Sequence, residues 1–373
     1  MLNYKLSLDD YQSFRDWKDR LAENFMLLKL QFSLCHNTLD RLSNCLSTSP
    51  NIVDLFKGDG RLLVYHWGNG EMKLICEIDG QIVAEDPFWL QRYPFIDMSK
   101  YGPGYYIRND IVMDTKLSHS GSLFVPSHNL HFGHFISDDL PWIAAYSALL
   151  LSHDLITLSN CLPLFIEKEL ASIGIKSSKL NVNNVHSGLV AYESSELFKG
   201  YVHGWPARAY LARKCVHALE SCERLDRTNL PSVMSQRLFI TRSKNVQSRI
   251  ANHQQVSSYL IRNGFRIVAL DGLSLLETRE LLRGCEIAIS ECGTTTLVTA
   301  ICLPADSRLI TLMPSVLLQS PSNEMIRSGL PYALMFHPSI SVCLGIPQSD
   351  HHIQSSIIAL YSITDLERLI KAL

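Results

Sequence analysis

The sequence predicts an α/β protein whose second half is built around a parallel sheet. There, short apolar runs alternate with helical segments: RLFITR, FRIVAL, CEIAIS and SRLITLM are expected strands, and HQQVSSYLIRN, SLLETRELLRG and GTTTLVTAICL are expected helices. Strands that alternate with helices of this length are typical of βαβ units. A looser strand-to-helix order begins near Ser122, and a helical segment followed by a meander comes before it.

The first part of the chain has two different patterns. Residues 8–47 carry an apolar helical rhythm, formed by Phe14, Trp17, Leu21, Phe25 and Leu28. Residues 61–85 contain apolar runs separated by GNG and DG, which predicts an antiparallel meander with tight turns. The segment PFWLQRYPFIDMSKYGPGYY, rich in aromatic residues, Pro and Gly, is expected to be an irregular loop.

Capping patterns predict where several helices begin. Ser274 and Glu277 form a capping box ahead of LLETRELL, and Thr364 and Glu367 form a second box in TDLERLIKAL. Near residue 140, Pro141 is tolerated only in a first helical turn. We therefore expect a helix that starts at about residue 140 with Asp139 as its cap.

Composition excludes several classes of protein. The 373 residues are 46% hydrophobic and 19% charged, so the chain can bury cores and is not disordered. With 34 Lys and Arg against 36 Asp and Glu, it lacks the basic excess of a general nucleic-acid binder. No run is long enough to span a membrane, and the first residues lack the apolar core of a signal peptide. The 10 cysteines form no disulfide framework, so we expect reduced thiols in the cytoplasm.

One stretch of this nearly neutral chain contains basic residues and no acidic ones. From Thr228 to Leu270 there is no Asp or Glu, while Arg242, Lys244 and Arg249 fall in its centre. Arg242 ends the expected strand RLFITR, and ligands of open parallel sheets bind at the carboxyl ends of strands. Because guanidinium groups bind phosphate bidentately, the stretch predicts an anion site, with solvated surface charge as the alternative for each residue.

A second candidate is the turn Glu291–Thr296, which leaves the strand CEIAIS and opens a helix. Gly293, Thr294 and Thr295 would present free N–H groups at the positive helix end, which suits a phosphate. Ordinary helix capping by threonine is the alternative. Glu291 would accept hydrogen bonds from sugar hydroxyls or pair with a nearby Arg.

A third candidate is the cluster SHNLHFGHFISDDLPW. It contains His128, His131 and His134, followed by Asp138 and Asp139. The histidines can be interpreted as a metal site, as loop packing, or, for His134 beside an acid, as a general base. We favour loop packing for His128 and a general base for His134.

These segments resemble the family-61 glycosyltransferases. HFGHFISDDLPWI is similar to a first signature, with a His or Gly-His pair ahead of an acid and Leu-Pro, and LFITRSKNVQSRIANHQQV to a second, with Arg242, Arg249 and Asn252. The stretch from GFRIVAL to RLITLMP is similar to a third, in which the family's His before the turn glycine is replaced by Cys292.

The resemblance implies a GT-B-like fold, with two Rossmann-like domains facing a cleft and an N-terminal helical and β-meander extension. The expected divisions are an extension at 1–120, an acceptor-side domain at 121–226, a nucleotide-sugar domain at 227–350, and a C-terminal helix at 351–373 returning to the first domain. The polar segment DRTNLPSVMSQ marks the main boundary.

The resemblance also implies an activity. The chain would be an inverting, metal-independent hexosyl- or pentosyltransferase that moves a sugar from a nucleotide-sugar donor, such as a UDP-sugar, to a glycan or lipid-linked glycan. It would act in polysaccharide biosynthesis (capsule or lipopolysaccharide) from the cytoplasmic face of the inner membrane, without a cofactor. The rival interpretations are a metal-dependent hydrolase using the three histidines and a non-catalytic nucleotide-sugar-binding protein.

Roles follow residue by residue. His134 would be the base, oriented by Asp139 or Asp138. Donor phosphate and nucleotide would be bound by Arg242, Arg249, Lys244, Asn252, Gly293, Thr294 and Thr295. Glu291 and His131 would contact the donor sugar or the acceptor.

Overall fold

The computed structural model consists of two compact units, which are described separately. The first unit comprises residues 1–10 and 50–211, and the second comprises residues 11–49 and 212–373. The structure describes residues 2–7, 12–32, 36–48, 52–66, 72–78, 81–83, 96–97, 106–107, 115–125, 132–141, 154–158, 168–171, 176–178, 184–193, 205–218, 236–242, 248–319, 331–348 and 357–372.

The first unit contains an eight-stranded mixed sheet in the order β4-β3-β2-β10-β7-β8-β9, with β1 also paired to β2. Its antiparallel part is formed by β1 (Leu2–Ser7), β2 (Ile52–His66), β3 (Met72–Ile78) and β4 (Gln81–Val83), which confirms the predicted meander. Its parallel part is formed by β7 (Thr115–Val125), β8 (Asp154–Leu158), β9 (Lys176–Ser178) and β10 (Asn184–Glu193). A separate pair, β5 (Ile96–Asp97) and β6 (Tyr106–Ile107), completes the strands described in this unit.

Residues 132–141 differ from the sequence prediction. A short helix α4 (Phe132–His134) runs into a π-helical turn η2 (Phe135–Asp139), so helical structure starts earlier than residue 140. Asp139 therefore lies within the π-helical turn and does not cap a helix. A proline ring clashes with the carbonyl four residues earlier in a regular helix, and a widened turn ahead of Pro141 accommodates that ring.

The second unit contains the predicted parallel sheet. Its six strands have the order β12-β11-β13-β14-β15-β16, and all neighbours are parallel except β15 and β16. The strands are β11 (Gln236–Thr241), β12 (Phe265–Ala269), β13 (Cys285–Glu291), β14 (Arg308–Pro314), β15 (Ile340–Pro347) and β16 (Ala359–Leu360). The four predicted strands are confirmed, and β15 extends them to the doubly wound order 2-1-3-4-5.

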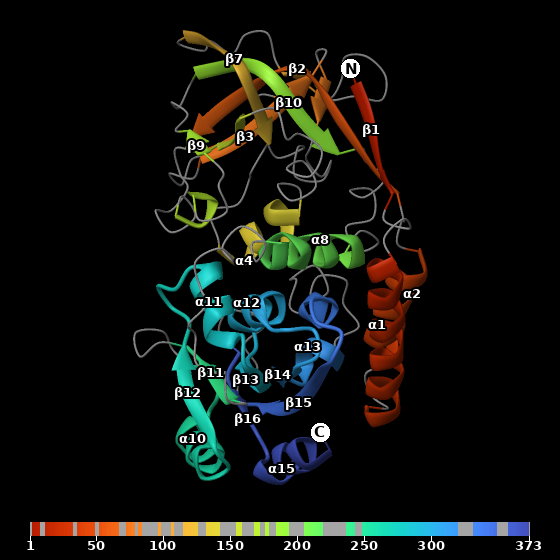
Figure 1. Ribbon diagram of the computed structural model, residues 1–373, viewed down its shortest axis with the longest axis vertical. Helices are drawn as coiled ribbons and strands as arrows, with labels where there is room; N and C mark the ends of the chain where they lie inside the picture. Colours follow the sequence, from red (N-terminus) through yellow and green to blue (C-terminus); the bar gives the residue numbers. More distant parts are fainter. Residues whose placement is uncertain are drawn as a thin grey trace, which may run out of the picture. The chain divides into compact units, whose positions relative to one another are not determined.

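Helices lie on both faces of this sheet (Figure 1). One face carries α10 (His253–Arg262) and α15 (Ile363–Ala372), and the other carries α11 (Leu275–Leu282), α12 (Thr294–Cys302) and the short α13 (Val316–Gln319). Alternate strand residues supply the two faces. Phe239, Ile289 and Ile310 pack with Val256 and Leu260 of α10 in one buried cluster.

The capping predictions have different outcomes. The predicted box of Ser274 and Glu277 caps α11 in both directions. At the last helix the prediction was wrong, because α15 begins at Ile363 and the hydroxyl of Ser362 accepts from the backbone N–H of Asp365.

The first two helices and the last helix belong to the second unit, which differs from the sequence prediction. Helices α1 (Gln12–Gln31) and α2 (His36–Thr48), placed by the sequence analysis in an N-terminal extension, group with the second unit. The predicted apolar positions of α1 are all buried. The C-terminal helix was expected to return to the first domain, but Leu366 packs into the core of the second unit's sheet.

Helix α8 (Trp205–Ala218), the 3₁₀ turn η3 (Pro331–Met335) and a helical turn at residues 168–171 are also described. The six cysteines whose side chains the structure describes are free thiols: Cys45, Cys215, Cys285, Cys292, Cys302 and Cys343. No helix in the described part of the chain is long and apolar enough to cross a membrane.

Candidate functional site

The candidate site lies where the order of the second unit's sheet reverses. β11 lies between β12 and β13. The chain therefore passes from β11 to its neighbour on one side, β12, and then crosses to its neighbour on the other side, β13. In doubly wound sheets ligands bind outside the carboxyl ends of the strands at such a switch point. Thr241 ends β11, Glu291 ends β13, and Arg242 and Gly293 follow closely in the chain.

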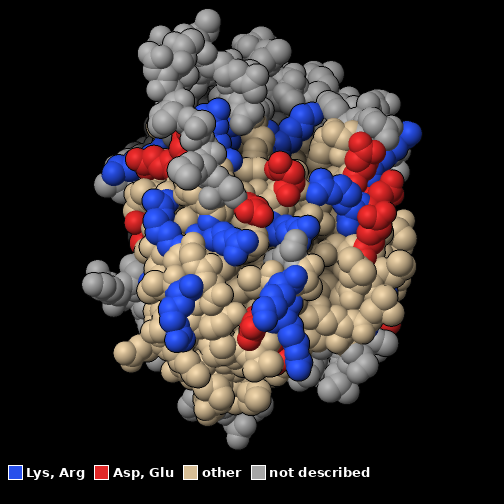
Figure 2. Space-filling view, turned by 60° about the horizontal axis from the view of Figure 1, so that its bottom comes forward, with Lys and Arg blue, Asp and Glu red and all other residues tan. Residues whose placement is uncertain are grey.

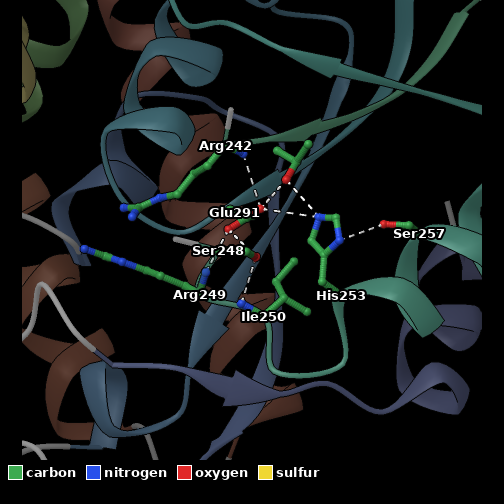
Figure 3. A network of polar contacts seen from close by, with 8 residues as sticks. Arg242, Ser248, Arg249, Ile250, His253, Ser257 and Glu291 are labelled. Atoms are coloured by element: carbon green, nitrogen blue, oxygen red, sulfur yellow. Dashed lines mark hydrogen bonds and ion pairs between the residues drawn. The ribbon is translucent and has the colours of Figure 1, made fainter. Parts of the chain in front are cut away.

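The carboxylate of Glu291 is the centre of a polar network (Figure 3). Its Oε1 accepts hydrogen bonds from the hydroxyl of Thr241 and from the backbone N–H of Arg242, the latter at 3.3 Å. Its Oε2 accepts from Ser248 Oγ at 3.1 Å and from the backbone N–H of Arg249 at 3.0 Å. The residue is 0% exposed, so these protein donors replace water around a buried negative charge.

His253 extends the network at the start of α10. Its Nε2 lies 3.0 Å from Thr241 Oγ1 and 3.9 Å from Glu291 Oε1, and its Nδ1 lies 3.3 Å from Ser257 Oγ. Its ring also lies beside the buried ring of Phe239, 6.0 Å away between centroids. The imidazole therefore joins α10 to the ends of β11 and β13.

The side chains of Arg242 and Arg249 extend to the same side of the network, away from His253 (Figure 3). Both reach Gly293. A Cβ atom on this glycine would lie 3.3 Å from Arg242 Nη2 and 3.3 Å from Arg249 Nη1. Arg249 Nη1 also donates to the carbonyl of Cys292 at 3.2 Å. Gly293 has φ 127°, a conformation that a side chain would strain, so glycine both permits the turn and leaves room for the two guanidinium groups.

Gly293 is also the N-cap of α12, and its cap is open. Within the described residues no side chain makes a capping hydrogen bond to this helix end. Exposed N–H groups and the helix dipole make such an end attractive to anions. Burial lowers the pKa of Arg242, and the nearby charge of Arg249 lowers it further, with Glu291 acting in the opposite direction. An anion bound between the two arginines would relieve that repulsion.

Buried hydrogen bonds join the first turn of α12 to β13 and β14. The hydroxyl of Thr296 donates to the carbonyl of Glu291 at 2.8 Å, and it lies 2.9 Å from Ser290 Oγ and 3.0 Å from Thr311 Oγ1. All of these side chains are buried. Thr294 and Thr295 are half-buried and lie at the open end of the helix.

The structure brings together only part of the predicted set. Arg242, Arg249, Gly293, Thr294 and Thr295 lie around one helix end, as the sequence analysis expected of a phosphate site. Asn252 is engaged elsewhere: its side-chain amide donates to the carbonyl of Tyr361 at 2.9 Å and accepts from the Tyr361 N–H at 3.0 Å. The carboxylate of Glu291 faces protein donors, an arrangement that suits support of the site rather than contact with a sugar.

Other predicted residues lie outside the described part of the chain. These are Lys244, His128 and His131, together with the side chains of His134, Asp138 and Asp139. Among the side chains that the structure does describe, no group of three His, Cys, Asp or Glu could hold a metal ion. The proposed roles of Lys244, His128, His131, His134, Asp138 and Asp139 stay predictions.

Thr241, Ser248 and His253 belong to the network but were not predicted from the sequence. The position of Thr241 at the end of a predicted strand, next to Arg242, could have marked it as a site candidate. Because side chains alternate along a strand, Thr241 is expected to point away from the Arg242 side chain. Ser248 and His253 gave no such signal, since only the pairing of distant segments brings them to Glu291.

Figure 2 shows Lys and Arg side chains interspersed with Asp and Glu over one face of the molecule. The chain as a whole has a formal net charge of −2.

Comparison with known proteins gives one family. The sequence model described as Glycosyltransferase 61 matches residues 132–310. No curated protein matches the chain. A solved structure, the bacterial iron-containing dodecameric glycosyltransferase TibC from enterotoxigenic E. coli H10407, is 13% identical and covers 71% of this chain and 76% of its own, with a TM-score of 0.29.

Proposed function

We propose that the chain is a glycosyltransferase that transfers a hexose or pentose from a nucleotide-sugar donor, because residues 132–310 match the sequence model of glycosyltransferase family 61. The acceptor is a glycan or lipid-linked glycan. The transfer inverts the anomeric centre and needs no metal ion. The setting is surface polysaccharide synthesis at the cytoplasmic face of a membrane.

The observation that carries this proposal is the convergence of two guanidinium groups on the N-cap of α12. Arg242 and Arg249 both follow β11 in the chain, and a Cβ on Gly293 would lie 3.3 Å from Arg242 Nη2 and 3.3 Å from Arg249 Nη1. Two arginines and an open helix end match the diphosphate of a nucleotide sugar in charge and in hydrogen-bond donors. In the transfer these groups would stabilise the charge that develops on the leaving diphosphate, the role that a divalent cation plays elsewhere.

The acceptor side of the reaction belongs to the segment around α4 and η2, which begins the family match. We assign the general base to His134, supported by Asp138 or Asp139. The base removes the proton from an acceptor hydroxyl, which attacks the anomeric carbon from the face opposite the leaving diphosphate. A GT-B arrangement, in which a cleft separates donor and acceptor domains, is part of this proposal.

A thermal-shift titration with UDP, GDP and CMP tests the donor site. At 100 times its dissociation constant, a bound nucleotide adds ~2.7 kcal/mol to the free energy of unfolding. We expect one nucleoside diphosphate to raise the melting temperature equally with and without EDTA. Stabilisation that requires Mg²⁺ or Mn²⁺ would overturn metal independence, and binding without any sugar transfer would favour a non-catalytic binding protein.

The base assignment makes a separate prediction. His134→Ala should lower turnover by ~10²–10⁴, the range for loss of a general base, with donor affinity little changed. Release of nucleoside diphosphate measures turnover, and His128→Ala is the matched control. If Asp138→Asn or Asp139→Asn abolishes turnover while His134→Ala does not, the base is a carboxylate.

A further inference from the structure

The most unusual group in the site is one that cannot touch a substrate. Glu291 is 0% exposed, yet its carboxylate accepts four hydrogen bonds. Two of these donors are the backbone N–H groups of Arg242 and Arg249, the residues whose side chains meet at Gly293. One carboxylate therefore joins the backbones of both arginines.

We propose that Glu291 is a positioning residue that sets the two guanidinium groups at the spacing a diphosphate requires. This inference rests on the proposed function, in which these two groups hold the donor. Glu291 acts through Arg242 and Arg249, because its own oxygens face the protein.

The two arginines differ in how much other support their backbones have. Arg242 directly continues β11, whose pairing with β13 fixes its course. Arg249 lies outside the named strands. Its carbonyl accepts from the N–H of Ala359 at 2.9 Å, and its N–H donates to Glu291 at 3.0 Å. The carboxylate thus provides one of the two main-chain bonds that locate Arg249.

Electrostatics gives a second reason for a carboxylate at this position. The two guanidinium groups repel each other, and long side chains would separate if their backbones could move. A buried negative charge behind them offsets part of the repulsion without occupying the space where an anion binds. Ser248 strengthens this link, since its hydroxyl donates to Glu291 Oε2 and accepts from the N–H of Ile250 at 3.1 Å.

The substitution Glu291→Gln tests the role with little change of shape. A carboxylate can accept from both arginine N–H groups at once, one on each oxygen. A glutamine has one oxygen and one NH₂ group, so in either orientation one of the two N–H groups faces a donor. We expect the affinity for UDP and for inorganic pyrophosphate, measured by calorimetry, to fall at least about tenfold.

A gentler pair of variants removes the dependence on a buried substitution. Ser248→Ala deletes one donor to Glu291 and should also weaken pyrophosphate binding. Ser257→Ala makes the same chemical change at the far end of the network, where the hydroxyl contacts His253, and should leave the affinity at the wild-type value. Melting temperatures of all variants identify any loss of fold.

The outcomes separate the two proposals. Weaker binding in Glu291→Gln and Ser248→Ala, with Ser257→Ala unchanged, supports the positioning role. If Arg242→Ala and Arg249→Ala weaken binding but Ser248→Ala and a folded Glu291→Gln do not, the positioning role is overturned and the donor site stands. If the wild-type chain binds neither UDP nor pyrophosphate, the donor site fails, and the inference fails with it.

Discussion

At the scale of single residues, the site depends on two like charges held close together. Arg242 is half-buried, and both burial and the charge of Arg249 lower its pKa. An arrangement that is unfavourable for the empty site becomes favourable once a doubly charged anion lies between the guanidinium groups. The residue should therefore matter to binding much more than to folding.

Arg242→Ala should weaken nucleoside diphosphate binding about 10- to 100-fold, the loss expected for one charged hydrogen-bonding group. The free energy of unfolding without ligand should stay the same or rise, because the repulsion with Arg249 disappears. Arg237→Ala, at the exposed opposite end of β11, is the matched control. Calorimetry and urea unfolding measure the two quantities, and an unstable variant with normal affinity would show that Arg242 is a structural residue.

Gly293 combines a backbone and a packing requirement at one position. Its φ of 127° is costly for any side chain, and a methyl group there would press on both guanidinium groups. Gly293→Ala should lower stability by ~1–3 kcal/mol and also weaken nucleotide binding. Gly272, with φ 82° and open space around it, gives the control: Gly272→Ala should share the backbone cost and keep the affinity.

At the scale of secondary-structure elements, much of the second unit was predictable because its signals are local. Alternating apolar runs, Ser274 with Glu277, and Gly264 after α10 each act within a few residues of the structure they specify. The last helix shows the limit of such signals. Ser362 with Asp365 and Thr364 with Glu367 offer two starts, and the structure uses the first, in a helix whose Leu366 is buried in the core.

The site was only half predictable for the same reason. Arg242, Gly293 and Thr294 were identified because the carboxyl end of a strand and the start of a helix are features of the sequence itself. Burial of Glu291 by Ser248 and the N–H of Arg249 depends on pairing between β11 and β13, whose register joins residues far apart in the chain. No local pattern encodes that pairing.

Helix α12 is supported at its other end by a buried arginine. Arg213 donates to the carbonyls of Ala300, Ile301 at 3.3 Å and Leu303 at 2.8 Å, and its guanidinium lies 5.2 Å from the ring of Trp17. A positive charge at a helix C-terminus interacts favourably with the helix dipole. Its N–H groups also satisfy carbonyls that the helix leaves free. Burial lowers the pKa of Arg213 to about 9, which still leaves it charged at neutral pH.

Arg213→Met keeps an unbranched apolar side chain, shorter than that of arginine, and removes the guanidinium hydrogen-bond donors. We expect the free energy of unfolding to fall by ~2–4 kcal/mol, because buried carbonyls lose their partners. Nucleotide affinity of the folded protein should not change, since the proposed phosphate site is at the opposite end of α12. Lys214→Met, the control, removes an exposed charge from α8, the helix that also carries Arg213. Equal destabilisation by the two variants would contradict the capping role.

At the scale of the whole molecule, stability should depend on pH through a histidine remote from the candidate site. His337 is 0% exposed and is held by two hydrogen bonds. Its Nδ1 accepts from the N–H of Ser339 at 3.1 Å, so its Nε2 carries the proton and donates to the carbonyl of Pro304 at 2.9 Å. A second proton on Nδ1 would break the bond to Ser339. Burial, followed by the charge of Arg213, lowers the pKa of His337 from 6.5 to about 3.

The direction of the pH effect follows from these values. Between pH 6.5 and about 3 the unfolded chain binds a proton at His337 that the folded chain does not, so acidification favours unfolding. This residue's share of the loss between pH 7 and pH 5 is about 2 kcal/mol. Urea unfolding at both pH values, for the wild-type chain and for His337→Gln, isolates it because all other groups titrate in both proteins. The variant should start less stable at pH 7 and lose less on acidification, and an equal loss in the two proteins would show that His337 is protonated in the folded state.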